Sequence, residues 1–225
     1  MPMPNTGRYR TLADLPDTLK LFPLPGALLL PRSELPLNIF EPRYVAMVND
    51  AMAGDRLIGM IQPEHENSDL SGNPALFKIG CAGRITSFAE TPDERILINV
   101  TGISRFAIEE ELDTTTPYRQ IKASFAPFTD DLVPGHRQDE VDRPALLKVF
   151  RAYLDANDLS TDWREVERAS TEALVNTLSA LAPYESRDKQ ALLEAASLKA
   201  RADVLVALTE ISLARAGGPT QSRLQ

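Results

Sequence analysis

The chain has 225 residues, of which 43% are hydrophobic and 25% are charged, and its formal net charge is −8. This balance is ordinary for a globular protein and supplies enough apolar residues for a core over most of the length. Nucleic-acid affinity comes mainly from clustered cations that meet phosphates. Because this chain is acidic and its arginines are scattered, we expect no nucleic-acid partner.

The cellular location is predicted from the single cysteine and from the N-terminus. Cys81 has no second cysteine to pair with, which is typical of a reducing compartment. The first residues contain no apolar core of signal-peptide length, and no stretch approaches the roughly 18 consecutive apolar residues of a membrane span. The sequence therefore predicts a cytoplasmic protein without a membrane segment.

The first part of the chain is predicted to be flexible and then mainly strand. Residues 1–18 are polar and contain several prolines, which is typical of a flexible terminus. Short strands are expected at Leu19–Leu24 and Ala27–Leu30, because the turn dipeptide Pro25-Gly26 separates two apolar runs.

One helix interrupts the strands. Pro42 suits a first helical turn, and Gly54 stands where a C′ glycine ends a helix. Apolar residues recur between them at helical spacing: Tyr44, Met47, Val48, Ala51 and Met52. This stripe predicts a helix that packs on the strands.

The strands that follow are expected to close on themselves. They are predicted at Arg56–Gln62, Ala75–Glu90, Glu94–Val100 and Tyr118–Phe125, with a hairpin link at Thr91-Pro92-Asp93. Glycines inside or beside these runs indicate the bulges and sharp bends that a closing sheet needs: Gly80, Gly83 and Gly102. Residues 19–128 are therefore predicted to form a β-barrel subdomain.

The apolar period becomes helical after an acidic linker at 129–142. One helix is expected around Leu146–Leu154, and a second is expected from the cap Asp162 as far as Leu181, with Pro183 after it. Ser186 and Ser197 are predicted to cap two more helices. The expected fold is α+β: a β-barrel with one packed helix, a helical bundle at 143–216, and a disordered tail at 217–225.

Three segments resemble the N-terminal, substrate-binding domain of Lon proteases, which also occurs in cereblon. The first runs from Leu21 to Tyr44, the second holds Gly80–Ile85 and Gly102–Phe106, and the third is Asp188–Glu194. The resemblance covers roughly residues 19–212. It implies a PUA-like barrel followed by helices.

Two parts of the complete Lon protease have no counterpart in this sequence. A phosphate-binding Gly-x-x-x-x-Gly-Lys-[Ser/Thr] loop does not occur, so the sequence carries no ATP-driven motor. The segment that would hold the protease's serine is also missing. The chain thus resembles stand-alone bacterial Lon-domain proteins, and we expect no enzymatic activity and no cofactor.

No residue pattern indicates catalysis or metal binding. His65 and His136 are expected in a polar loop and in the linker, and their neighbours match no metal-ligand spacing. Cys81 lies between glycines, where a buried structural thiol is expected. We therefore predict no catalytic residue and no metal site.

The candidate contact residues stand where a strand enters the first helix. Phe40, Arg43 and Tyr44 are expected to border a groove that accepts an extended or apolar peptide. A structural interpretation stays open, in which the aromatic rings are core and Arg43 fastens carbonyls or a carboxylate. The resulting hypothesis is a non-enzymatic module that binds unfolded or partly folded polypeptides.

Two alternatives remain for its function. The first is an adaptor or regulator that engages one specific folded partner. The second is a nucleic-acid binder through the PUA-like barrel, which the acidic balance of the chain disfavours.

Overall fold

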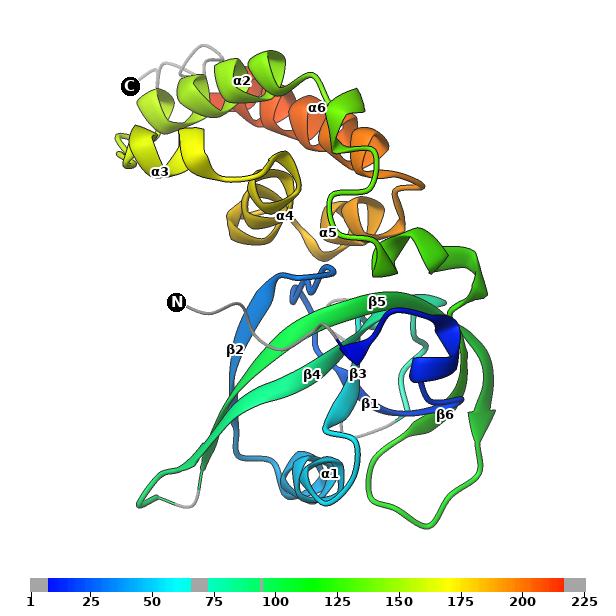
Figure 1. Ribbon diagram of the computed structural model, residues 1–225. Helices are drawn as coiled ribbons and strands as arrows, with labels where there is room; N and C mark the ends of the chain where they lie inside the picture. The colour runs from blue at the N-terminus through cyan, green and yellow to red at the C-terminus, as the bar shows by residue number, and fades with distance from the viewer. Residues whose placement is uncertain (1–7, 66–72, 94, 217–225) are drawn as a thin grey trace.

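The computed structural model describes residues 8–65, 73–93 and 95–216, and it shows a strand-rich part below a helical part (Figure 1). The strands are β1 (Thr18–Pro23), β2 (Glu34–Ile39), β3 (Leu57–Ile61), β4 (Ile79–Glu90), β5 (Ile96–Leu112) and β6 (Gln120–Ser124). The α-helices are α1 (Pro42–Met52), α2 (Arg143–Ala156), α3 (Trp163–Arg168), α4 (Thr171–Leu181), α5 (Ser186–Glu194) and α6 (Leu198–Ala216). Short 3₁₀ helices are η2 (Leu12–Asp14), η3 (Ala126–Leu132) and η4 (Gln138–Glu140).

The strands form one six-stranded sheet in the order β2-β5-β4-β3-β1-β6. Strand β1 pairs with β3 in parallel, and the other neighbours pair antiparallel. The 17-residue strand β5 pairs with β2 and β4 and also with β6, so the pairings return from β6 to β5. The chain is a mixed protein of helices and a six-stranded sheet; the PUA-like barrel and the helical bundle stay predictions.

Two glycines let the chain pass closely over the sheet. A Cβ atom at Gly102 would lie 2.1 Å from the carbonyl oxygen of Leu30, and one at Gly83 would lie 2.4 Å from Val100 Cγ1. The amide of Gly102 donates to the Ser33 carbonyl, and the Gly102 carbonyl accepts from the Arg32 amide. The register of β4 on β5 shifts at Gly83, so the bulge predicted there is confirmed.

The prediction for the apolar run before Pro31 is wrong. Ala27–Leu30 forms no strand, although Leu28, Leu29 and Leu30 are all buried. The run is a buried loop held by the backbone pairing beside Gly102. A short apolar run between turn residues has no periodicity that separates a strand from such a loop.

Helix α1 confirms the predicted element at its first residue, Pro42. Its buried stripe is the predicted one, with Tyr44, Met47, Val48 and Ala51 facing the strands. Strand boundaries differ more. Strand β5 runs on to Leu112, past the Val100 end that we predict, and β4 begins only at Ile79. The hairpin link is confirmed, because the Thr91 amide donates to the Arg95 carbonyl.

The predicted continuous helix up to Leu181 is wrong. The chain breaks at Ala169, and the Ser170 hydroxyl caps the new helix α4 by accepting from the Ala173 amide at 3.2 Å. The predicted cap Ser197 is confirmed by its 3.1 Å bond from the Ala200 amide. Ser186 is not a cap; it is the buried first residue of α5.

The two parts share one apolar cluster. It includes residues of the sheet and of α1, together with Leu146, Val175, Leu192 and Leu205 from four helices of the upper part. A second cluster surrounds Phe106 inside the strands. The predicted linker 129–142 contains the end of η3 and all of η4, and its Asp131 is buried. The predicted tail 217–225 lies outside the described residues.

Candidate functional site

Helix α5 is joined to the strands by a buried amide network. Gln62 follows β3, and its amide nitrogen donates to Gln190 Oε1 at 3.1 Å and to the Ser186 carbonyl at 3.2 Å. Its Oε1 accepts from the Gly26 amide, and Lys189 Nζ donates to the Gly26 carbonyl at 2.8 Å. The Pro25-Gly26 turn is thus held against α5.

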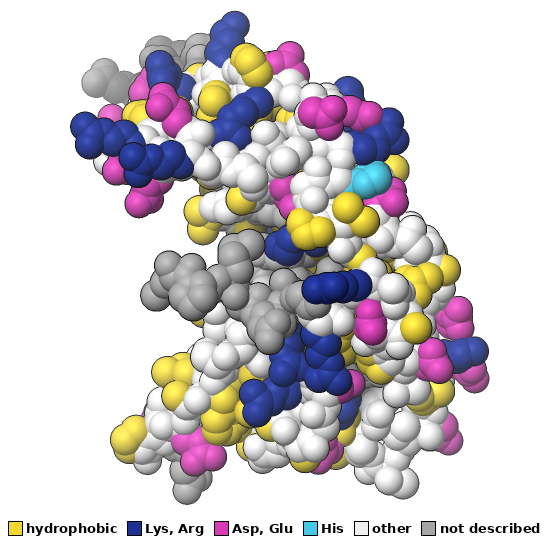
Figure 2. Space-filling model, viewed as in Figure 1, with side chains coloured by type: hydrophobic (Ala, Val, Ile, Leu, Met, Phe, Trp, Pro, Cys, Tyr) yellow, Lys and Arg dark blue, Asp and Glu magenta, His cyan; other side chains and the backbone are white. Residues whose placement is uncertain are grey.

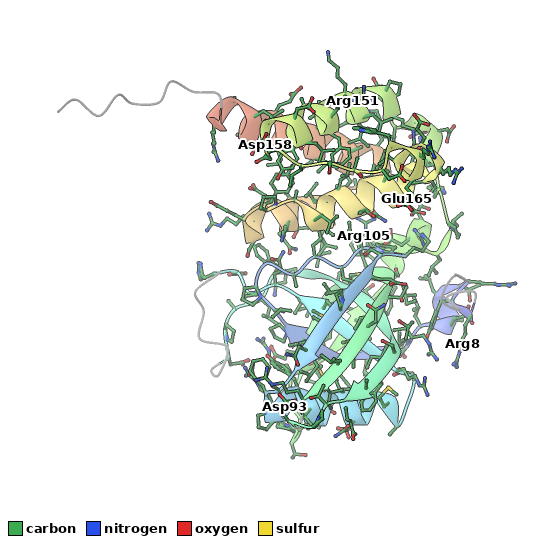
Figure 3. All side chains as sticks on the ribbon, turned by 90° about the vertical axis from the view of Figure 1, so that its left-hand side faces the viewer. Arg8, Asp93, Arg105, Arg151, Asp158 and Glu165 are labelled. Atoms are coloured by element: carbon green, nitrogen blue, oxygen red, sulfur yellow. The ribbon has the colours of Figure 1, made fainter. Side chains whose placement is uncertain are left out.

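A buried ion pair connects the same helix to β5. Arg105 bonds Asp131 through two parallel contacts of 2.9 Å, and the side chains are only 5% and 9% exposed. Arg105 Nη1 also donates to the carbonyls of Leu193 and Ala195, just past the middle of α5. Figure 3 shows Arg105 at the junction of strands and helices. The three segments that carry the Lon resemblance therefore meet at this junction, where their role is structural.

A second buried arginine continues the network into the helices. Arg201 donates to the Leu192 carbonyl at 2.9 Å and to Asn176 Oδ1 at 3.1 Å, and Asn176 in turn donates to the Pro31 carbonyl. Burial, together with the nearby Arg105, lowers the pKa of Arg201 to about 10. The junction is fully hydrogen-bonded and offers little room for a ligand.

The predicted contact residues Phe40, Arg43 and Tyr44 take three different environments. Phe40 is 62% exposed, with the Arg95 guanidinium 5.7 Å from its ring centre. Tyr44 is 4% exposed and packs on Phe22 with ring centres 4.3 Å apart. Arg43 lies over the Tyr44 ring and bonds Glu41 at 2.8 Å, so it fastens a carboxylate as the structural interpretation expects.

A cavity of about 250 Å³ does border this helix, and Arg43 and Tyr44 line it. Its other walls come from Pro23, residues 73–74 and residues 111–119. They include the ion pair of Arg119 with Glu111, whose closest contacts are 2.6 Å. Phe40 is not among its lining residues. The structure thus brings two of the three predicted residues to one cavity, and that cavity is polar.

A second cavity, of about 280 Å³, lies among the helices and is mainly apolar. We name it the helical groove. It is lined from α2, α4 and α6 and from the loop after α2 by Leu146, Val149, Phe150, Tyr153, Leu154, Leu159, Ser160, Thr161, Leu178, Leu181, Ala182, Tyr184, Leu205 and Thr209. Leu159 and Leu181 leave 53% and 76% of their surface exposed. Exposed leucines beside an apolar hollow are typical of a contact surface.

The loop after α2 and the short helix α3 set one end of the groove. Asp158 takes a left-handed backbone conformation with φ 52°, which turns the chain sharply after α2. Trp163 then packs on Phe150 with ring centres 6.0 Å apart, and the Arg151 guanidinium lies 4.3 Å from the Trp163 ring centre. Figure 3 shows Arg151 and Asp158 on the part of the molecule farthest from the strands.

Sequence reasoning missed the helical groove because it assigned these residues to the core. Leu146, Val149, Phe150, Tyr153 and Leu154 do form the predicted stripe, but the stripe faces a hollow that the other helices leave open. The available signal was Leu159, an apolar residue in an otherwise polar loop.

The remaining candidate groups show no reactive arrangement. His65 is exposed, and His136 Nε2 lies 3.4 Å from Asp130 Oδ2. Cys81 is buried, and burial raises the pKa of its thiol. In the part of the chain that the structure describes, no three His, Cys, Asp or Glu side chains stand close enough to hold a metal ion. Within the same ranges, no helix has the length and apolar content needed to cross a bilayer.

Comparison with known proteins gives consistent matches. Lon protease of Cytophaga hutchinsonii is 26% identical over 204 residues, which are 88% of this chain and 24% of that protein. Lon protease 2 of Myxococcus xanthus is 25% identical over 198 residues, 87% of this chain and 24% of that protein. The chain thus spans about a quarter of the length of these curated relatives.

Solved structures show the same fold. A Lon N-terminal domain protein from Xanthomonas campestris matches with a TM-score of 0.60 and 22% identity, covering 84% of this chain and 97% of that one. The N-terminal domain of the Mycobacterium avium complex Lon protease matches with a TM-score of 0.63 and 18% identity, covering 86% and 98%. The family model for the ATP-dependent protease La (LON) substrate-binding domain matches residues 18–210, so the chain belongs to this family.

Proposed function

We propose that this chain is a non-catalytic, cytoplasmic recognition module, a PUA-like barrel with a helical bundle, that binds apolar segments of polypeptides in the helical groove. The observation that carries the proposal is the apolar hollow of about 280 Å³ with two exposed leucines at its rim. Family membership supports substrate recognition as its role.

The size of the groove suits apolar side chains. Its volume lies near the lower end of the usual range for ligand pockets. Burial of a Leu or Phe side chain contributes about 1.5–3 kcal/mol, and ordering a flexible ligand offsets part of that gain. Affinity for one segment is therefore modest, in the range of about a micromolar to a millimolar dissociation constant.

Unfolded polypeptides are the preferred ligands for a physical reason. A folded protein buries most of its large apolar side chains, whereas an unfolded or partly folded chain exposes them in flexible segments. A groove that accepts single apolar side chains without chemistry distinguishes the two states of a client by what each exposes.

One observation favours the adaptor as a second candidate function. Leu97 is 46% exposed on the outer side of the sheet, paired with Asn38 on β2 and Ala89 on β4. Figure 2 shows hydrophobic side chains gathered at the lower left, over the hairpin of β4 and β5. With the neighbouring Phe40, this surface suits a folded partner. Phe40, Arg43 and Tyr44 stay proposed contact residues of this side of the molecule.

Leu181→Asp tests which surface binds polypeptides. A carboxylate at the rim of the helical groove removes an apolar contact and opposes desolvation, so binding of a fluorescein-labelled, reduced and carboxymethylated α-lactalbumin should weaken about tenfold. Leu181 is 76% exposed, so the substitution leaves the fold intact. Fluorescence anisotropy measures the dissociation constant.

Leu97→Asp is the matched control, because Leu97 is another exposed leucine on a different surface. It should leave the dissociation constant unchanged. The reverse pattern, with Leu97→Asp weakening and Leu181→Asp neutral, would assign the binding to the sheet face. If the unaltered protein does not bind the labelled chain at high micromolar concentration, the proposed function is wrong.

A further inference from the structure

A second hollow, of about 230 Å³, follows the helical groove along α6. Leu208, Ile211 and Pro183 give it an apolar floor, and Ile211 is 49% exposed. Tyr184 lines both this hollow and the helical groove, so the two share a wall. Together they form a longer surface along one helix than either gives alone.

The shared wall is held in place by a hydrogen bond. Thr209 donates its hydroxyl proton to the Leu205 carbonyl at 2.7 Å, which leaves the Tyr184 hydroxyl as the donor to Thr209 Oγ1, also at 2.7 Å. Burial raises the pKa of Tyr184, and the nearby Asp188 carboxylate adds to the rise. The ring therefore stays neutral and fixed, with its apolar faces turned to both hollows.

The second hollow differs from the first in its charge. Glu185 and Asp188 line it, and neither carboxylate forms an ion pair with any side chain of the described ranges. Arg215 is the one cation among its described lining residues, so two carboxylates and one guanidinium leave a surplus of one negative charge. Lys189, the next residue on α5, is committed to the Gly26 carbonyl.

We infer that the two hollows form one extended site that selects polypeptide segments in which an apolar side chain is closely followed by Lys or Arg. The inference rests on the proposed function of the helical groove. The apolar side chain enters the groove, while the aliphatic stem of the following residue crosses Ile211 and Leu208. Its cationic head then reaches Glu185 and Asp188, which is charge complementarity that an acidic flank lacks.

Three fluorescein-labelled peptides with one Phe-Leu-Phe core test the inference. They differ only in the two residues after the core, which are Lys-Lys, Ser-Ser or Glu-Glu. At low salt the Lys peptide should bind the unaltered protein about fivefold more tightly than the Glu peptide, because exposed ion pairs are worth little each. In the double variant Glu185→Gln/Asp188→Asn this preference should fall below about twofold, with unchanged binding of the Ser peptide.

The double variant Glu165→Gln/Glu167→Gln is the control, since it removes the same charge from α3 outside both hollows and should keep the preference. Equal binding of the Lys and Glu peptides, or a preference that survives Glu185→Gln/Asp188→Asn, overturns the inference while the proposed function stands on the Ser peptide. If the Ser peptide does not bind, the apolar groove is inactive and both are overturned.

Discussion

Asp131→Ala should destabilise the protein by about 3–5 kcal/mol, because it leaves the Arg105 guanidinium buried without its partner. Asp131 accepts from Arg105 Nε, Nη2 and backbone amide, each at 2.9 Å. Removing one member of a buried pair costs far more than the pair itself contributes. Urea denaturation followed by circular dichroism measures the change in the free energy of unfolding.

The neighbouring carboxylate provides the control for this substitution. Asp130 is 72% exposed and lies 3.4 Å from His136, so Asp130→Ala should cost less than about 1 kcal/mol. The double variant Arg105→Met/Asp131→Leu should recover much of the lost stability, since no buried charge remains. Equal losses in Asp131→Ala and Asp130→Ala would contradict the role given to the buried pair.

Gly102→Ala should destabilise the protein by about 1–3 kcal/mol. Its Cβ atom would lie 2.1 Å from the Leu30 carbonyl oxygen and 3.3 Å from Leu29 Cγ, so backbone must move in a fully packed region. The loop Ala27–Leu30 would lift from β5, and its three buried leucines would lose packing. The midpoint of urea denaturation should fall.

Gly54→Ala is the matched glycine for this test. A Cβ there would meet only the Asp50 carbonyl oxygen at an ordinary 3.6 Å, and its backbone is not left-handed. The midpoint should therefore stay the same or rise slightly. A Gly102→Ala protein as stable as Gly54→Ala would refute the close approach of loop and strand.

The local elements with strong signals were predictable from the sequence. Pro42 and the stripe after it define α1, and the polar link after Glu90 defines the hairpin. The break between α3 and α4 was not, because Ser170 fits a helix stripe as well as a cap until the neighbouring helices fix the direction of the chain. The position of Ala27–Leu30 depends on Gly102, which is distant in sequence.

The candidate site was less predictable than the fold. The buried partner of Arg105 lies in a segment whose acidic residues look alike, and only packing singles out Asp131. A helical stripe likewise predicts which residues face inward, but not whether other helices fill the space in front of them. The helical groove exists because Leu178 and Leu205 on opposite helices do not meet across it.

The most direct test of the central claim is photo-crosslinking of the carboxymethylated α-lactalbumin ligand, carrying a diazirine label, followed by mass spectrometry of the linked peptides. The groove account predicts links concentrated on α2, α4, α6 and the loop around Leu159, which all line the hollow. Links concentrated on the strands around Leu97 and Phe40, with the helices unlabelled, would contradict it.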